Sequence, residues 1–197
     1  MSLDKTQILD AARAAFARHG FRKTSLGDIA QPLGVAKTAL YHHFPGGKED
    51  IFHAVINREE ETVLANMEEA VALEDNLSRR LRALVLAKLI HLRHLRDLLM
   101  VPRDVGEEVS LLYEAHETAF RTAERALIAR ILATGQEVGL FRRIDLEALA
   151  IRVQFVLNRM ELPLLFEESP EEMTRELDGL LDLLLHGILK QEAGQNG

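Results

Sequence analysis

The pattern of apolar and polar positions predicts short helices at the start of the chain. In residues 4–20, "DKTQILDAARAAFARHG", apolar residues recur at helical spacing, and Gly20 follows as the expected C-cap. A second short helix is expected from "TSLGDIA", with Thr24 as its N-cap, and a third through Thr38 to about His43. The apolar faces of the first two helices are formed by Ile8, Ala12, Ala15, Phe16, Leu26, Ile29 and Leu33.

The connection between the second and third helices predicts a helix-turn-helix. Gly34 permits a tight or left-handed turn, and Ala30 is small enough for two helices to cross closely. Pro32 has no amide proton and disfavours helical geometry at Gln31, so we expect a distorted last turn in the second helix. The sequence "PGG" at 45–47 then ends the third helix.

The rest of the chain has the pattern of longer helices. A long fourth helix begins at about Lys48, and Asp145 is a plausible N-cap for a later helix that Pro163 should kink or end. The last helix has Ser169 as N-cap and Pro170 at its first position. We therefore predict an all-α chain of about nine helices, with a helix-turn-helix domain at 1–47 and a longer helical domain at 48–197.

Composition places the chain among globular proteins and hides a charge asymmetry. Hydrophobic residues make up 47% and charged residues 28%, which argues against general disorder, and the absence of cysteine excludes disulfides and thiolate sites. The net charge is -7, but residues 1–58 carry +3, so the remainder carries -10. A basic head on an acidic body still allows nucleic acid as a partner, because phosphate attraction is local. Without a signal-type segment or a long apolar run, we expect a cytoplasmic protein with no membrane partner.

The histidines raise the alternative of a metal sensor or a metal-dependent helical-bundle enzyme. His42 and His43 are adjacent, so on a helix they point about 100° apart and do not easily share an ion. His91 and His94 have a spacing that could share a ligand, and His116 could join them from another helix. The Glu-x-x-His pair of di-iron bundles does not occur, and the common catalytic motifs are absent as well. We therefore expect neither an enzyme, nor a metal site, nor a cofactor.

A DNA-recognition helix explains more of residues 34–50. Such a helix presents small or polar side chains to the major groove above apolar anchors. Lys37, Thr38, Ala39 and Tyr41 fit the outward set, whereas Val35, Leu40 and Phe44 fit the anchors.

Residues Gln7 to Phe52 resemble the DNA-binding domain of the TetR (tetracycline repressor-like) family. The resemblance rests on "ILDAARAAFARHGFRKTSLGDIA", "LGVAKTALYHHF" and "GGKEDIF", and on their spacing; "PGGKED" is one residue longer than the common form. It implies a regulator, in most cases a repressor released from a palindromic operator by a small-molecule effector. It also implies phosphate contacts from Thr24, the histidine pair and Lys48. The DNA-binding residues expected are Thr24, Ser25, Ala36, Lys37, Thr38, Ala39, Tyr41, His42, His43 and Lys48.

Such a regulator would be a homodimer, because two recognition helices must reach two half-sites about 34–36 Å apart. The last two helices carry more apolar surface than one neighbour could cover, which predicts an interface of two helices from each subunit. The expected interface residues are Leu149, Val153, Val156, Leu157, Met160, Met173, Leu177, Leu180, Leu181, Leu184 and Ile188.

The central helices should enclose a mostly apolar effector cavity with a few polar groups. The candidate lining residues are Leu89, Arg93, His94, Met100, Tyr113, His116, Phe120, Phe155 and Arg159. Histidine, tyrosine and arginine would suit an apolar molecule with an acidic or hydroxyl end.

Overall fold

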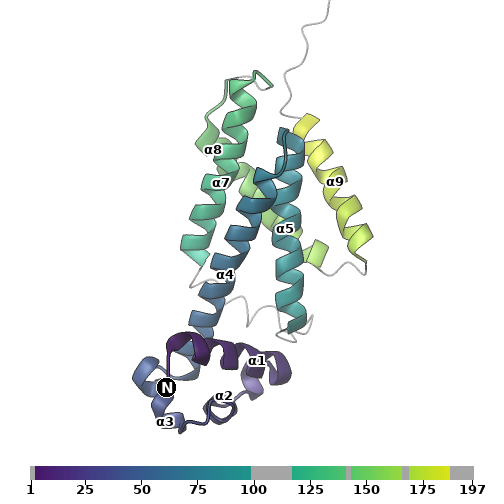
Figure 1. Cartoon of the computed structure of the whole chain (residues 1–197). Coiled ribbons are helices and arrows are strands. Elements are labelled where there is room, and N and C mark those ends of the chain that lie inside the picture. Colours follow the sequence, from purple (N-terminus) through teal and green to yellow (C-terminus); the bar gives the residue numbers. More distant parts are fainter. Residues whose placement is uncertain (1–2, 99–116, 141–142, 166–168, 187–197) are drawn as a thin grey trace, which may run out of the picture. The chain divides into compact units, whose positions relative to one another are not determined.

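The computed structural model describes residues 3–98, 117–140, 143–165 and 169–186 (Figure 1). Over these residues the chain forms eight helices and no strand, which confirms the all-α prediction and agrees closely with the expected number of helices. With the labels of Figure 1, the helices are α1 Lys5–Lys23, α2 Leu26–Ala30, α3 Lys37–His43, α4 Lys48–Ala72, α5 Leu77–Leu98, α7 Glu117–Glu137, α8 Leu146–Leu165 and α9 Pro170–His186.

Local side-chain caps set the start of α1 and of α2. The Asp4 carboxylate accepts the backbone N–H of Gln7 at 2.9 Å, and the Gln7 side chain accepts the N–H of Asp4 at 3.2 Å. Ser25 forms the same kind of capping box with Asp28 at the start of α2. The expected N-cap, Thr24, lies one residue earlier and is instead the C-cap of α1.

Two features shorten or interrupt the first helices. Gly20, inside the bounds of α1, has φ 73° and ψ 161°, so the predicted helix end at this glycine is a break within α1.

α2 ends at Ala30, because Pro32 follows and residues 31–34 form turns. The N–H groups of Leu33 and Val35 both bond to the carbonyl of Ala30, and Gly34 adopts φ 67°. Pro32 therefore ends α2 earlier than the apolar pattern suggested.

The first three helices share one core with the beginning of α4 (Figure 1). Phe16, Phe21 and Phe52 form an aromatic cluster in it, with ring centroids 4.4–5.7 Å apart. The buried residues of this core are Ile8, Ala12, Ala15, Phe16, Ile29, Ala30, Leu40, Phe44, Ile51, Phe52, Val55 and Ile56. Most of the apolar positions expected for α1 to α3 are among them, whereas Leu26, Leu33 and Val35 are partly buried and pack against this core.

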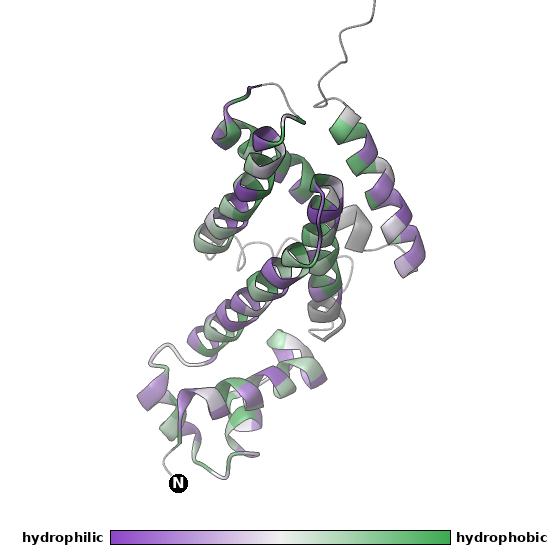
Figure 2. Cartoon of the chain, turned by 45° about the horizontal axis from the view of Figure 1, so that its top comes forward, coloured by the Kyte–Doolittle hydropathy of each residue, from purple (hydrophilic) through white to green (hydrophobic). Residues whose placement is uncertain are grey.

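The chain divides into two compact units, and α4 contributes to both. One unit contains residues 1–62 and 92–120, and the other contains residues 63–91 and 121–197. The core of the second unit includes Leu81, Leu84, Leu89, Ile128, Leu132, Ala150, Val153, Leu157, Leu177 and Leu181. In Figure 2, α9 alternates between hydrophobic and hydrophilic residues along its length, as expected for a helix with one buried face.

The second unit also holds a buried polar cluster that joins three helices. Lys88 of α5 donates to the Glu124 carboxylate of α7 at 2.7 Å and to the Asn158 side chain of α8 at 3.2 Å. The Gln154 amide of α8 donates to the other Glu124 oxygen at 2.7 Å. Because each buried charge has its partners, the cluster is compatible with an otherwise apolar core.

The expected caps of the last two helices are confirmed. The Asp145 carboxylate accepts the N–H groups of Glu147 and Ala148, both at 3.1 Å. The Ser169 hydroxyl accepts the N–H of Glu172 at 3.1 Å, and Pro170 is the first residue of α9. Pro163 lies within the bounds of α8 and does not end that helix.

Candidate nucleic-acid interface

α3 presents polar side chains outward over an apolar anchor, as expected for a recognition helix. Lys37, Thr38 and His42 are exposed, and the Tyr41 side chain is 48% exposed. Leu40 is fully buried between them and fixes the helix to the core. The remaining expected residues of this region are exposed or partly buried, namely Ala36, Ala39 and His43.

The N-cap residue of α3 is small and provides no capping side chain. Ala36 is the N-cap, with no side-chain hydrogen bond to the helix. The first N–H groups of α3 therefore have no capping side chain competing for them at that end. The N–H of Ala39 bonds to the Ala36 carbonyl at 2.9 Å, so the backbone of the turn satisfies this group without a capping side chain.

Gly47 positions Tyr41, and the sequence pattern did not single it out for this role. Gly47 is buried and has φ 71°. A Cβ atom there would lie 3.2 Å from Cε1 of Tyr41 and 3.6 Å from Cδ1 of Leu26. The phenol ring thus packs directly against the glycine backbone. The extra residue of "PGGKED" was the available signal, because a glycine pair in a tight loop indicates a required positive φ or a close approach.

Thr24 does not face solvent, which corrects the expected phosphate contact. Its side chain is 2% exposed, and its hydroxyl is within hydrogen-bonding distance of the Gly20 carbonyl at 2.7 Å and the Ala15 carbonyl at 3.2 Å. The hydroxyl therefore satisfies carbonyls at the end of α1. Sequence reasoning placed the α2 cap one residue too early, and this shifted the role of Thr24.

Ser25 is the exposed hydroxyl at the N-terminus of α2. Its Oγ lies 3.3 Å from the N–H of Asp28, which it accepts, and 2.7 Å from the Asp28 carboxylate, to which it donates. The Asp28 carboxylate also accepts the Ser25 N–H at 2.8 Å. The backbone N–H and then the hydroxyl of Ser25 lower the pKa of the Asp28 carboxyl, which therefore stays ionised.

Lys48 holds the end of α1 in place. Its Nζ donates to the Phe21 carbonyl at 3.1 Å and lies 3.4 Å from the Arg22 carbonyl. The ammonium also lies 4.5 Å from the centre of the Phe21 ring. An ammonium has three protons, so these contacts occupy most of its capacity. These contacts give Lys48 a positioning role that the sequence did not indicate, and its contact with a phosphate backbone stays a prediction.

Two ion pairs connect α1 to the first half of α4. Arg13 Nε lies 2.8 Å from Glu59 Oε1, and Arg58 Nη1 lies 2.7 Å from Asp10 Oδ1. Glu59 is buried, whereas the Arg58–Asp10 pair is largely exposed. The buried member of such a pair depends on its partner more strongly than exposed charges do. These contacts orient the helix-turn-helix on the linking helix.

Five of the expected effector residues have side chains in the described part of the chain. Leu89 and Phe120 are buried, and Arg93 is partly buried. Phe155 is 60% exposed, and the Arg159 guanidinium lies over its ring at 5.3 Å, so this pair forms a surface contact. The others, His94, Met100, Tyr113 and His116, have side chains outside the described residues.

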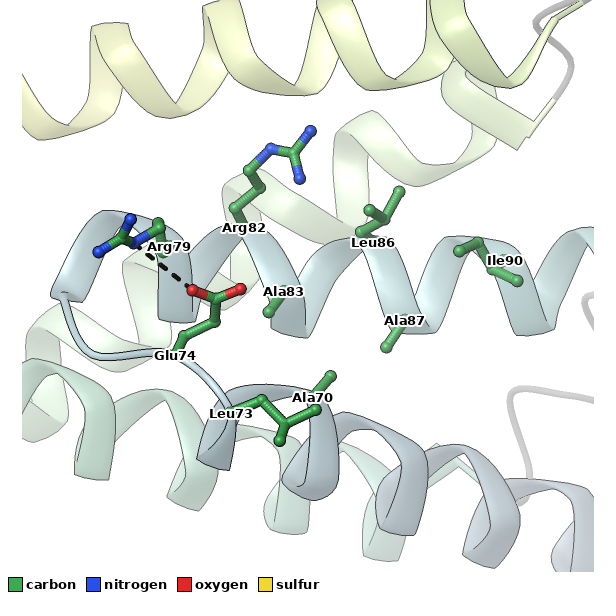
Figure 3. Close-up of a pocket in the computed structure, with 9 residues that line it drawn as sticks. All are labelled: Ala70, Leu73, Glu74, Arg79, Arg82, Ala83, Leu86, Ala87 and Ile90. Atoms are coloured by element: carbon green, nitrogen blue, oxygen red, sulfur yellow. Dashed lines mark ion pairs between the residues drawn. The ribbon is translucent and has the colours of Figure 1, made fainter.

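The second unit instead has an open groove of about 520 Å³ between the end of α4 and α5 (Figure 3). None of the expected effector residues lines it. Its charged residues are already paired, Arg79 with Glu74 at 3.5 Å and Arg82 with Asp178 at 2.6 Å. The groove is lined by Ala70, Leu73, Glu74, Arg79, Arg82, Ala83, Leu86, Ala87 and Ile90.

Five of the expected interface residues are buried inside the chain itself, which corrects the prediction for them. They leave almost no surface for a second copy, because α8 and α9 turn these side chains into the core of their own unit: Val153, Leu157, Met173, Leu177 and Leu181. Val156 is 37% exposed, and Leu149, Leu180 and Leu184 are partly exposed. The side chains of Met160 and Ile188 lie outside the described residues.

The same helices carry exposed apolar residues that the sequence pattern did not assign to the interface. On α8 these are Ile151 and Phe155, 44% and 60% exposed, and on α9 it is Leu183, 74% exposed. Phe155 directly precedes Val156, an expected interface residue, in the sequence of α8. Exposed large apolar side chains of this kind indicate a contact surface.

Neither a metal centre nor a membrane span was found where the structure could be searched. Over the described ranges, no three His, Asp or Glu side chains are grouped so that they could hold an ion. His94 and His116 of the metal hypothesis have side chains outside those ranges. In the same part of the chain, no helix is both long and apolar enough to cross a bilayer.

Known proteins share this arrangement. Residues 8–55 match the sequence profile described as "Bacterial regulatory proteins, tetR family". HTH-type transcriptional regulator UidR of Escherichia coli (strain K12) is 28% identical over 94% of this chain and 79% of its own length. HTH-type transcriptional repressor KstR2 of Mycobacterium tuberculosis (strain ATCC 25618 / H37Rv) is 26% identical over 69% of this chain and 68% of its own length. The crystal structure of a transcriptional regulator from Cytophaga hutchinsonii ATCC 33406 superposes with TM-score 0.74 and 25% identity, covering 93% of this chain and 97% of that one.

The outward face of α3 on its buried anchor, with these matches, defines a helix-turn-helix protein that binds DNA and regulates transcription. Residues 8–55 match the TetR family of bacterial regulatory proteins, and the relatives that match over most of the chain are transcriptional regulators. Members of this family are regulators that bind DNA operators and act as dimers, and the family is not enzymatic. The matches do not favour the alternative of a metal sensor or metal-dependent enzyme.

Proposed function

We propose that the chain is a cytoplasmic repressor that binds a near-palindromic operator as a homodimer and is released from it by a small-molecule effector. The observation that carries the proposal is the surface of α3, where Lys37, Thr38 and Tyr41 are exposed above the buried Leu40. Polar side chains that protrude from an anchored helix can read base edges in a major groove. The similarity to KstR2, a transcriptional repressor, supports repression rather than activation.

Within this proposal, residues 1–47 bind DNA and residues 48–197 bind the effector and the second subunit. Lys37, Thr38 and Tyr41 read bases or backbone, while Ser25, His42 and His43 contact phosphates at the flanks. Ala36 and Ala39 permit a close approach of α3. Lys48 adds positive charge and holds the end of α1 in the orientation that these contacts need.

The dimer would form through the exposed apolar side chains of α8 and α9. Ile151, Phe155 and Val156 of α8 and Leu183 of α9 have apolar surface left to bury. In a two-fold symmetric dimer the same surface patch of both subunits forms the interface, so each exposed residue buries apolar surface twice. The partly exposed Leu149, Leu180 and Leu184 would complete this surface.

The effector would act by linkage. The effector binds better at one spacing of the dimer's two helix-turn-helix domains and so favours that spacing. The operator binds better at another spacing and favours that one. Binding of each then weakens binding of the other by the same factor. Among the expected effector residues, Arg93 and Phe120, both in the first unit, remain candidates for the cavity wall, because they are partly buried and buried.

The test is a mobility-shift and footprinting experiment on the DNA upstream of the protein's own gene. We expect one protected palindrome, with an affinity that falls steeply as salt rises, because Lys and Arg side chains displace counterions from phosphates. Lys37→Ala should change the sequence preference, since Lys37 lies on the exposed face of α3. Failure to protect any palindrome at any salt concentration contradicts the proposal.

A further inference from the structure

Glu60 of α4 is a buried carboxyl group with no partner among the residues that the structure describes. Its exposed fraction is 8%, and its Oε1 atom has neither a hydrogen bond within that part of the chain nor solvent contact. The neighbouring Glu59 is buried to a similar degree, but it accepts a hydrogen bond from Arg13 at 2.8 Å. Over the described ranges, the fold thus provides a cation for one carboxylate and none for the next.

Glu60 lies on an apolar face of α4. Ile56, one turn earlier, and Val63, one turn later, are 4% and 2% exposed. In this setting, burial alone raises the pKa of the Glu60 carboxyl from its ordinary value of 4.5 to about 7. A helical position between two buried aliphatic residues would be filled at lower free energy by leucine or methionine. A carboxyl group at such a position therefore calls for a function.

We propose that Glu60 is the polar anchor of the effector site and that the effector is an apolar organic cation, such as a protonated amine on a hydrocarbon body. The inference rests on the proposed function, because it names the chemistry of the effector that the repressor hypothesis requires. A protonated amine supplies the charge and the N–H donors that Oε1 lacks. Its hydrocarbon body matches the aliphatic face on which Glu60 lies.

Two alternative roles of Glu60 predict different outcomes. If the carboxyl group is only a structural acid that stays protonated, its removal changes stability and leaves ligand preference unchanged. In the second alternative, the effector has an acidic or hydroxyl end, as the histidine and arginine candidates suggested. Glu60 would then not bind it, because a carboxylate repels an acid, and the protein would bind amines no more tightly than alcohols.

The experiment uses the full chain and matched pairs of probes. Butylamine, hexylamine, octylamine and benzylamine are each compared with the alcohol of the same hydrocarbon skeleton, by equilibrium dialysis and by melting temperature. At least one amine should bind about tenfold or more tightly than its alcohol, as expected for a charge-assisted hydrogen bond. If no amine binds better than its alcohol, the inference is overturned.

Variants identify the carboxyl group responsible. Glu60→Gln keeps the size of the side chain and removes its charge, so it should abolish the preference for the amine. Glu61→Gln makes the same change one residue along, at an exposed position, and should retain the preference. A preference that survives in Glu60→Gln overturns the inference. A melting curve of Glu60→Gln as cooperative as that of the wild type shows that the loss does not come from unfolding.

A DNA arm separates this inference from the proposed function. The same amines should release the wild-type protein from its operator and should fail to release Glu60→Gln, which should still bind the operator. If alcohols or carboxylates release the wild type and amines do not, the repressor function stands and the role of Glu60 is wrong. If no operator is bound even without probes, the proposed function fails, whatever the amines do.

Discussion

The Lys48 ammonium lies 3.1 Å from the carbonyl oxygen of Phe21 and 4.5 Å from the centre of the same residue's ring. One side chain at the start of α4 thus holds both the backbone and the aromatic ring of a residue that follows the break at Gly20. The rings of Phe21 and Phe52 also pack together, with their centroids 4.4 Å apart, so the contact extends into the core of the helix-turn-helix. The position of α1 relative to the start of α4 depends on this lysine.

Lys48→Ala should therefore lower both stability and affinity. Loss of the charge-assisted hydrogen bonds and the cation–π contact should destabilise the fold by about 1–2 kcal/mol. Binding to all DNA sequences should weaken about equally, because no contact to a base edge is removed. Urea unfolding and mobility shifts measure the two effects. Lys37→Ala, on the exposed face of α3, should by contrast change sequence preference without changing stability; equal destabilisation by both variants contradicts this division of roles.

Gly47→Ala should disturb recognition through Tyr41. An added Cβ would meet Tyr41 Cε1 at 3.2 Å and would also be strained at φ 71°. Gly34→Ala is a matched control, because its φ is 67° and nothing in the described part of the chain lies within 4 Å of the added Cβ. Both changes should lose about 1 kcal/mol of stability from backbone strain. Only Gly47→Ala should alter the base preference in a binding-site selection, and an identical preference in both variants would show that Tyr41 is not displaced.

Variants of Thr24 and Ser25 should show which of the two hydroxyl groups is structural and which contacts DNA. Thr24→Val removes a buried hydroxyl that hydrogen-bonds to the Gly20 and Ala15 carbonyls, and should cost about 1–3 kcal/mol in thermal unfolding. Its DNA affinity should be normal at temperatures where it is folded. Ser25→Ala should lose about 1 kcal/mol as the α2 cap and also weaken DNA binding. A Thr24→Val protein that is fully stable but binds DNA poorly would restore the phosphate role for Thr24.

Phe155→Glu should dissociate the dimer while the subunit stays folded. Phe155 is 60% exposed, so a charge there is tolerated in one chain but not in a two-fold interface that buries it twice. Sedimentation equilibrium should show monomers with a normal helical spectrum. Leu177→Ala, at a fully buried position, should instead destabilise the subunit by about 2–5 kcal/mol. A dimer that persists in Phe155→Glu moves the interface away from this part of α8.

Glu60 should make stability depend on pH near neutrality. Below pH 4.5 the group is protonated in the folded and the unfolded chain, so it has no effect. Between pH 4.5 and about 7 the unfolded chain loses this proton and the folded chain keeps it, so stability falls as pH rises. The destabilisation is complete above about pH 7.

Glu60→Gln should therefore gain stability relative to the wild type as pH rises from about 5 to about 8. Urea midpoints measured across this range check the prediction. Glu61→Gln, at an exposed position, should follow the wild-type curve. Parallel curves for Glu60→Gln and the wild type would show that the carboxyl group is not desolvated in the folded chain.

Much of the fold was predictable because its determinants are local. The apolar spacing of Ile8, Ala12 and Phe16, the turn at Gly34 and the caps Asp145 and Ser169 act within one or two helical turns. The outward set of α3 was predictable for the same reason, since helical geometry alone separates Tyr41 from the buried Leu40. Thr24 was assigned wrongly because two adjacent hydroxyl residues are equally good N-caps in sequence, and the choice depends on the carbonyls at the end of α1.

By itself, the sequence determined the helices, their order and the exposed side of α3, because propensity, capping and helical period depend on neighbouring residues. Tertiary structure alone decided that Lys48 reaches Phe21, that Gly47 supports Tyr41 and that Glu60 is buried with no partner in the described part of the chain. It also decided which side of α9 is internal, with Leu177 buried and Leu183 exposed, although both are leucines on an amphipathic helix. The physical reason is that burial and pairing depend on side chains from helices far apart in the sequence, which no local pattern specifies.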